Sequence, residues 1–270
     1  MRPYDDELHD FGAHGAAPLP ASTAQGTVAH DGAQIWYASY GDATHPPVIL
    51  LHGGLGHSGN WGYQVPALVE GGYRAIVIDS RGHGRSTRDA RPYSYDLMTA
   101  DLLAVMDALT IPRAALVGWS DGAVIALTLA MQAPARVACV YFFGCNMDPS
   151  GTKEIIFGPV LERCFTRHAQ DYAELSATPA AFDAFVAAVS HMQSTQPDAT
   201  ATDLAQIRVP VTIVHSEHDE FIRREHAEYL ARSIPGAAFV LLPEVSHFAP
   251  LQRPDVFNRS VLAFLDRTHS

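Results

Sequence analysis

A serine framed by glycines follows an apolar run of the sequence and has the pattern of a catalytic nucleophile. Ser120 lies in the pentapeptide GWSDG at 118–122, directly after the apolar residues 114–117 and before the apolar stretch 123–131. A sharp strand-to-helix turn exposes the oxygen of such a serine, and only small flanking residues permit close approach of the backbone. The amino end of the following helix also supplies a positive dipole where an oxyanion would form. The pattern therefore predicts a nucleophilic Ser120, with an ordinary glycine-rich turn as the alternative.

An acid and a histidine that could serve this serine occur later in the chain. Asp219 comes shortly after the apolar run 211–214, and His247 comes shortly after the run 238–242. A nucleophilic serine needs a base and a group that orients that base, and the chain order serine, acid, histidine is a known one. Because catalytic groups gather at the carboxyl ends of parallel strands, we expect these side chains to meet at one edge of a sheet. The predicted catalytic residues are therefore Ser120, Asp219 and His247.

The acid loop also holds side chains that compete for a role. Glu217 and Glu220 flank Asp219, so either could be the acid, and Asp219 would then be a solvated loop residue. His215 and His218 lie beside it, but the sequence does not place the further ligands that a metal would need. We therefore predict no metal site and no cofactor.

Two other loops follow apolar runs and would reach the same edge of the sheet. The segment HGGL at 52–55 follows the run 48–51. Backbone N–H groups can form an oxyanion hole, and we predict that those of Gly54 and Asp121 do so, with a plain glycine turn as the alternative. The arginine-rich segment 79–86 favours a structural loop beneath the site over an anion-binding site.

The side chain of Asp121 allows two interpretations. A carboxylate at the amino end of a helix complements the helix dipole by roughly 0.3–1 kcal/mol. The same charge about 6–7 Å from a developing oxyanion would repel it by about 2–3 kcal/mol at an effective dielectric near 20. Either the side chain points away, or a positive group meets it. The hypothesis that follows is a substrate ammonium, as in an amino-acid ester.

The elements that must position these residues follow from the hydrophobic pattern. Apolar runs at 48–51, 75–78, 114–117 and 137–143 are typical of strands buried on both faces of a parallel sheet. Helical patterns lie between them, which predicts an α/β fold, a doubly wound mostly parallel sheet flanked by helices. Asp31-Gly32 predicts a hairpin turn near the amino end.

A helical insertion interrupts the alternation of strands and helices. We expect an N-terminal arm at 1–25, the first part of the core at 26–146, a small helical cap at 147–208, and the second part of the core at 209–270. Gly158-Pro159 should break or kink a helix within the cap. Pockets gather at such interfaces, so the predicted substrate-binding residues are Leu55, Trp119, Phe182, Phe185, Val186 and Phe248.

Composition excludes several classes of protein. The charged fraction of 17% is below the roughly 25% usual for globular proteins, which excludes disorder for most of the chain. The formal net charge of −11 argues against binding to nucleic acid or to an anionic membrane. No apolar run reaches the ~18 residues of a membrane span, and no signal peptide is visible. The spacing of Cys139, Cys145 and Cys164 matches no common zinc motif, so we expect a reducing, cytoplasmic setting. A small-molecule substrate is the expected partner, and no oligomeric state is predicted.

With these residues in place, the chain resembles the α/β-hydrolase family over about residues 24–268. The resemblance rests on the oxyanion-loop motif at 52–54, the segment DSRGHGRS at 79–86, the nucleophile elbow at 118–122, and the acid and histidine loops around Asp219 and His247. The Trp-Ser-Asp elbow is similar to that of the valacyclovir-hydrolase-like esterases. A serine nucleophile argues against haloalkane dehalogenases and epoxide hydrolases, which use aspartate there.

The resemblance implies a cofactor-free serine hydrolase that cleaves a small carboxylic ester, lactone or activated amide through an acyl-enzyme. It places the predicted cap over the site. The same triad and fold also serve carbon–carbon bond hydrolysis, hydroxynitrile cleavage and cofactor-free oxidation or perhydrolysis, so they do not determine the reaction. A non-catalytic ligand sensor is a third possibility.

Overall fold

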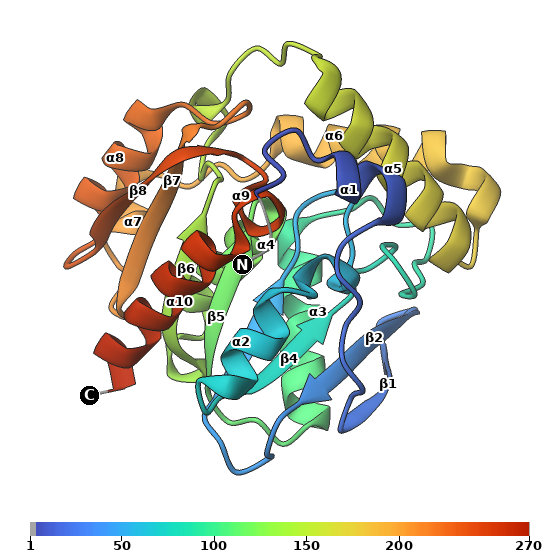
Figure 1. Ribbon diagram of the computed structural model, residues 1–270. Coiled ribbons are helices and arrows are strands. Elements are labelled where there is room, and N and C mark those ends of the chain that lie inside the picture. Colours follow the sequence, from blue (N-terminus) through green and yellow to red (C-terminus); the bar gives the residue numbers. More distant parts are fainter. Residues whose placement is uncertain (1–3, 270) are drawn as a thin grey trace.

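The computed structural model describes residues 4–269, which form one eight-stranded sheet with helices on both faces (Figure 1). The strands are β1 Ala24–His30, β2 Ala33–Tyr40, β3 Pro47–Leu51, β4 Arg74–Ile78, β5 Ala114–Trp119, β6 Val137–Phe143, β7 Val211–His218 and β8 Ala238–Ser246. Their order is β1-β2-β4-β3-β5-β6-β7-β8. β2 runs antiparallel to β1 and β4, and every pairing from β4 to β8 is parallel. The prediction of a doubly wound, mostly parallel sheet is confirmed.

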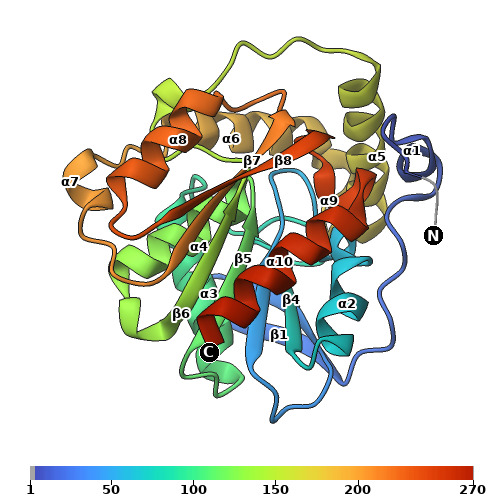
Figure 2. The same cartoon turned by 60° about the vertical axis from the view of Figure 1, so that its left-hand side comes forward.

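The helices form a layer on each face of the sheet (Figure 2). The α-helices are α1 His9–His14, α2 Gln64–Glu70, α3 Tyr95–Ala108, α4 Asp121–Gln132, α5 Pro159–Leu175, α6 Phe182–Thr195, α7 Ala201–Leu204, α8 Arg224–Ser233, α9 Ala249–Gln252 and α10 Pro254–His269. α2 and α10 pack on one face, and α3, α4 and α8 pack on the other. The two resulting apolar cores keep the central strands buried and rigid.

The carboxyl ends of the central strands meet at one edge of the sheet. Gly118 in β5 pairs with Leu51 in β3, and Trp119 pairs with Phe143 in β6. β7 and β8 continue this edge and are longer than the apolar runs suggested. As a result, Asp219 directly follows β7 and His247 directly follows β8.

The sequence pattern of the first hairpin is reproduced in the backbone. β1 and β2 pair through a two-residue turn in which both Asp31 and Gly32 have positive φ, 42° and 81°. This geometry matches the type I′ turn that suits the twist of the flanking strands.

The helical segment between β6 and β7 comprises α5, α6 and α7 (Figure 1). One local expectation was wrong: Gly158-Pro159 does not break a helix. α5 begins there instead, with Gly158 as the N-cap and Pro159 in the first turn. Proline suits the first helical position because its fixed φ fits and its missing N–H has no partner there anyway.

The chain before β1 is packed against the body. Leu8 and Phe11 are buried in the core that also contains Leu161 and Cys164 of α5. Figures 1 and 2 both show α1 beside α5. Residues 1–3 of the expected arm lie outside the described residues.

Candidate active site

Ser120 occupies a strained turn between β5 and α4. Its φ of 53° and ψ of −124° lie outside the regions that serine normally adopts. The backbone N–H of Ser120 donates to Phe143 O at 2.9 Å, which fixes the turn against β6. A Cβ on Gly122 would lie 2.1 Å from Leu51 O, so only glycine allows α4 to start this close to β3. The strain persists because the packing around it is fixed, as is common for a nucleophile.

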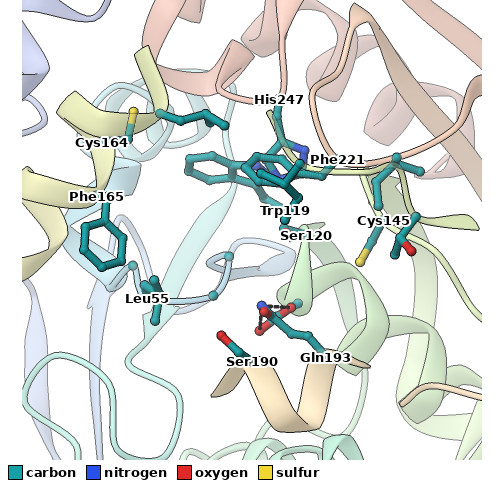
Figure 3. Close-up of a pocket in the computed structure, with 18 of the residues that line it drawn as sticks. Leu55, Trp119, Ser120, Cys145, Cys164, Phe165, Ser190, Gln193, Phe221 and His247 are labelled. Carbon is teal, nitrogen blue, oxygen red and sulfur yellow. Dashed lines mark hydrogen bonds between the residues drawn. The ribbon is translucent and has the colours of Figure 1, made fainter. Parts of the chain in front are cut away.

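His247 and Asp219 are hydrogen-bonded to each other. Nδ1 of His247 lies 3.0 Å from Oδ2 of Asp219, and both side chains are buried. Oδ1 of Asp219 accepts the backbone N–H groups of Phe221 and Ile222, each at 2.9 Å. Because Asp219 engages Nδ1, Nε2 is the ring nitrogen left for Ser120, and both His247 and Ser120 line the same cavity (Figure 3).

Glu217 and Glu220, the two other acids of this loop, accept hydrogen bonds from backbone groups. Glu217 accepts the backbone N–H of Glu244 at 2.9 Å. Glu220 accepts the backbone N–H of His247, also at 2.9 Å, and no described hydrogen bond joins it to the imidazole ring. The geometry therefore favours Asp219 as the acid that orients the ring.

The electrostatics of the pair favour an imidazolium that forms during reaction. Burial alone would lower the pKa of His247, but the carboxylates around it, that of Asp219 first and then those of Glu220 and Asp121, together raise the pKa above its ordinary value. Burial alone would raise the pKa of Asp219, but His247 and the two backbone N–H groups hold it below its ordinary value. Asp219 therefore stays ionised and stabilises positive charge on His247.

The glycine loop at the end of β3 lies against Ser120, because a Cβ on Gly53 would lie 3.1 Å from the Cβ of Ser120. A Cβ on Gly54 would lie 2.5 Å from Gln193 Nε2 and 2.7 Å from Asp121 Oδ2, so a larger residue there would displace the ends of these two side chains. His52 supports the loop from behind. Its Nε2 accepts the backbone N–H of Ser80 at 3.0 Å, so its Nδ1 carries the proton and donates to Gly53 O at 2.7 Å.

The arginine-rich loop after β4 is a structural element. Asp79 is fully buried, and its oxygens accept the backbone N–H groups of Ser58 at 2.7 Å and Arg85 at 2.9 Å. Arg81 is buried in a bidentate pair with Asp101. Asp79 and Arg81 are therefore paired with groups of the protein itself, which agrees with the structural role expected from the sequence.

Asp121 is a buried carboxylate in the cavity wall whose hydrogen-bond donors are neutral. The hydroxyl of Tyr95 donates to Oδ1 at 2.9 Å, and Nε2 of Gln193 donates to both oxygens at 3.1 Å (Figure 3). Burial raises the pKa of Asp121, and these two donors offset only part of that effect. The side chain therefore faces the cavity and does not point away from the site.

A cavity of about 590 Å³ surrounds Ser120. Its walls come from the glycine loop, the elbow, the segment before α5, the helices α5 and α6, and the acid and histidine loops. Among the predicted substrate-binding residues, Leu55, Trp119, Val186 and Phe248 line it.

Phe182 and Phe185 were wrongly assigned to the pocket. They are absent from its lining, and Phe185 is buried against Tyr172. The reason is the face of α6 on which they lie. Phe182, Phe185 and Val189 point into the core, whereas the lining residues of this helix are Val186, Ser190, Gln193 and Ser194.

Several residues that line the cavity were not predicted from the sequence. Gln193 and Tyr95, which hold Asp121, come from helices far apart in the chain. Cys145 follows β6 and lies near Ser120, where burial raises the pKa of its thiol far above the ordinary value (Figure 3). The spacing of Val186, Ser190 and Gln193 on one helical face could have indicated a polar wall.

His215 and His218 take different positions from each other. His215 is buried and its pKa is lowered by burial, whereas His218 is exposed. Within residues 4–269, no group of three or more histidine, cysteine, aspartate or glutamate side chains could hold a metal ion. No helix in this part of the chain is long and apolar enough to cross a membrane.

The chain matches known proteins over most of its length. The family model for the alpha/beta hydrolase fold matches residues 46–181. The serine hydrolase BPHL of Homo sapiens is 27% identical, and the match covers 96% of this chain and 92% of that protein. A putative carbamate hydrolase, RutD, of a Caulobacter species is 30% identical, with 83% of this chain and 92% of that protein covered.

A solved structure extends the likeness to three dimensions. A crystal structure described as that of an N-acyl homoserine lactone degrading enzyme has a TM-score of 0.68 and 28% sequence identity. The match covers 88% of this chain and all of that one.

Proposed function

Because this chain belongs to the α/β-hydrolase family and is an enzyme of that family, we propose that it is a serine hydrolase of a small carboxylic ester, lactone or activated amide. The observation that carries the proposal is the strained Ser120 in the wall of the cavity that His247 also lines, with Asp219 bound to the far side of the imidazole. The matched relatives that are described as acting on carbamates and lactones support this class of carbonyl substrate.

The mechanism uses two steps at the carbonyl carbon. His247 Nε2 takes the proton of Ser120 as its oxygen attacks, and Asp219 stabilises the imidazolium. The backbone N–H groups of Gly54 and Asp121 donate to the oxyanion. The intermediate then releases an alcohol or amine, which leaves with the proton from His247. Water, deprotonated by His247, attacks the acyl-serine, and His247 returns the proton to the oxygen of Ser120 as the acid is released.

The segment at 147–208 acts as a cap in this proposal. α5 and α6 supply one wall of the cavity, so they determine which acyl or alcohol groups reach Ser120. We place the enzyme in the cytoplasm, where a reducing environment suits its three free, buried cysteines.

The test combines labelling with turnover. A fluorophosphonate probe should label the wild type but not Ser120→Ala, and a panel of esters, lactones and diketones should separate acyl transfer from carbon–carbon cleavage. Ser120→Ala should lower kcat by at least ~10³-fold while the melting temperature changes little, because only binding and the oxyanion hole remain. Near-normal ester turnover by this variant would contradict the proposal, and so would turnover of diketones alone.

A further inference from the structure

Three consecutive large apolar side chains are exposed at the mouth of the cavity. Ile155 is 51% exposed, Ile156 is 82% exposed and Phe157 is 67% exposed. Within residues 4–269 the one other large hydrophobic side chain that is exposed is Tyr4, at the amino end. Exposed apolar side chains that are contiguous generally mark a surface that binds something, whereas scattered ones do not.

The three side chains do not face the same way. Ile155 and Phe157 line the cavity, whereas Ile156, between them, does not. The ring of Phe157 also meets the edge of Phe165, another lining residue, with centroids 6.3 Å apart. The two flanking side chains therefore continue the apolar wall of the cavity outward, and Ile156 points away from it.

The segment that carries them is fixed at its ends and free between. Lys153 donates its backbone N–H to Phe221 O and its Nζ to Asp219 O, each at 2.7 Å, which ties this end to the acid loop. Gly158 and Pro159 begin α5 at the other end. Among the described residues, those at 154–157 make no backbone–backbone hydrogen bond. In Figures 1 and 2 the chain before α5 arches away from the body at the top of the view.

The volume of the cavity indicates how large a substrate would be needed to fill it. Its volume of about 590 Å³ equals that of about 20 water molecules at ~30 Å³ each. A short acyl group such as acetyl would leave most of this space wet. The apolar side chains in the walls would then stay in contact with water, and their burial would contribute no free energy to substrate binding.

We propose that residues 154–157 form an apolar flap that contacts an extended apolar group of the substrate, so that the enzyme prefers esters with a medium-length acyl or alcohol chain. This inference rests on the proposed function and specifies its substrate. Burial of such a chain against Ile155 and Phe157 removes apolar surface of both partners from water. The free backbone lets the flap adjust to the chain, and its tie to the acid loop keeps it over the cavity.

The test is a chain-length series measured in variants of the flap. For the wild type, kcat/KM of nitrophenyl esters should rise from acetyl to octanoyl, by up to about fourfold for each methylene that becomes buried. A parallel series of acetate esters with alkyl alcohols of increasing length examines the leaving-group side. The rise of kcat/KM with chain length should occur in at least one of the two series, the acyl series or the alcohol series.

The double variant Ile155→Ser and Phe157→Ser should abolish that rise. We expect kcat/KM for the longest ester to fall by about 10-fold or more, since the two side chains together supply apolar contacts worth at least that factor, while the acetyl ester changes far less. Phe157→Leu, which keeps an apolar group, should retain most of the rise. All these side chains are exposed, so circular dichroism and melting temperature should stay those of the wild type.

Ile156→Ser is the matched control, because Ile156 is also an exposed apolar residue of the flap but lies off the cavity wall. It should leave both chain-length series unchanged. If Ile156→Ser reduces activity as much as the double variant, and only above the concentration at which the ester forms micelles, the flap binds a lipid interface and the inference is wrong. A chain-length profile that is the same in all variants also contradicts it. Neither result affects the proposed function, which is tested separately by labelling and turnover of the wild type and of Ser120→Ala.

Discussion

Gln193 of α6 donates its side-chain N–H to both carboxylate oxygens of Asp121, each at 3.1 Å, and so joins the helical insertion to the residue that follows Ser120. The hydroxyl of Tyr95 is the other described donor to that carboxylate. Both donors are neutral, and burial raises the pKa of Asp121. Among the described residues, no cationic side chain donates a hydrogen bond to this carboxylate.

Replacement of Asp121 by asparagine tests whether a substrate ammonium meets this carboxylate. Asp121→Asn keeps the size and the backbone N–H but removes the charge. We expect kcat/KM for an α-amino ester to fall by at least ~10-fold, whereas a neutral ester of equal size is unchanged or faster because about 2–3 kcal/mol of repulsion is relieved. Equal effects on the two esters would mean that Asp121 does not bind a substrate ammonium and only complements the helix dipole.

Much of the fold and the centre of the candidate site could be predicted because short sequence signals determine them. Continuous apolar runs require burial on both faces, which leads to a parallel sheet. Parallel strands bring their carboxyl ends to one edge, so Ser120, Asp219 and His247 were expected together before any geometry was known. The pentapeptide around Ser120 has a steric requirement that few residue types meet, as the close approach of Gly122 to Leu51 O illustrates.

The walls of the cavity could not be predicted in the same way. An apolar stripe on a helix marks the face that packs on the core, and Phe182 and Phe185 follow that rule, so choosing them as pocket residues was an error. The contact of Gln193 with Asp121 depends on how α6 crosses above α4, which no local pattern encodes. Likewise, the sequence does not distinguish the exposed Ile156 from the core isoleucines.

The choice among the three acids of the acid loop is open to a direct comparison. Asp219→Asn should slow turnover by ~10²–10⁴-fold, through loss of the acceptor that orients His247, while folding stays intact. Glu220→Gln keeps an oxygen that can accept the backbone N–H of His247, so its effect should be small. Glu217→Gln keeps an acceptor for Glu244 and should also be mild. If either glutamine variant is slower than Asp219→Asn, Asp219 is not the catalytic acid.

The pH dependence of kcat/KM should report the charge around His247. The base form is required, so kcat/KM should fall as the pH decreases through the pKa of His247, which lies above its ordinary 6.5 because Asp219, together with Glu220 and Asp121, outweighs burial. Asp219→Asn removes the carboxylate with the largest effect, so that burial offsets more of the effect of the remaining charges. The acid limb of the residual activity should therefore move to lower pH. A limb that stays in place, or a flat wild-type rate between about pH 5 and 9 with chemistry rate-limiting, would contradict this assignment.

The amino-terminal residues and the histidine loop are connected through one side chain, that of Gln252. Its Oε1 accepts the backbone N–H of Ser246 at 2.9 Å, directly before His247. Its Nε2 donates to the backbone carbonyl of Asp6 at 2.7 Å. Gln252 is buried, so both contacts are shielded from water. Through it, the chain before β1 is connected to the loop that carries His247, the base in the proposed mechanism.

Two variants of Gln252 separate its contacts. Gln252→Glu keeps an acceptor for Ser246 but cannot donate to Asp6 O, whereas Gln252→Met loses both bonds. A buried partner left unsatisfied costs about 1–3 kcal/mol, so Gln252→Glu should lower the free energy of unfolding by about that amount and Gln252→Met by up to about twice as much. Gln252→Met should also lower kcat/KM by roughly 3–10-fold and shift its acid limb, since His247 then loses its fixed distance to Asp219.

Arg253→Gln is the control for these two variants. It breaks the ion pairs with the exposed carboxylates of Asp6 and Glu244, each worth at most ~1 kcal/mol, and should leave the pH profile unchanged. Loss of stability in Gln252→Met with an unaltered pH profile would mean that Gln252 supports only the fold.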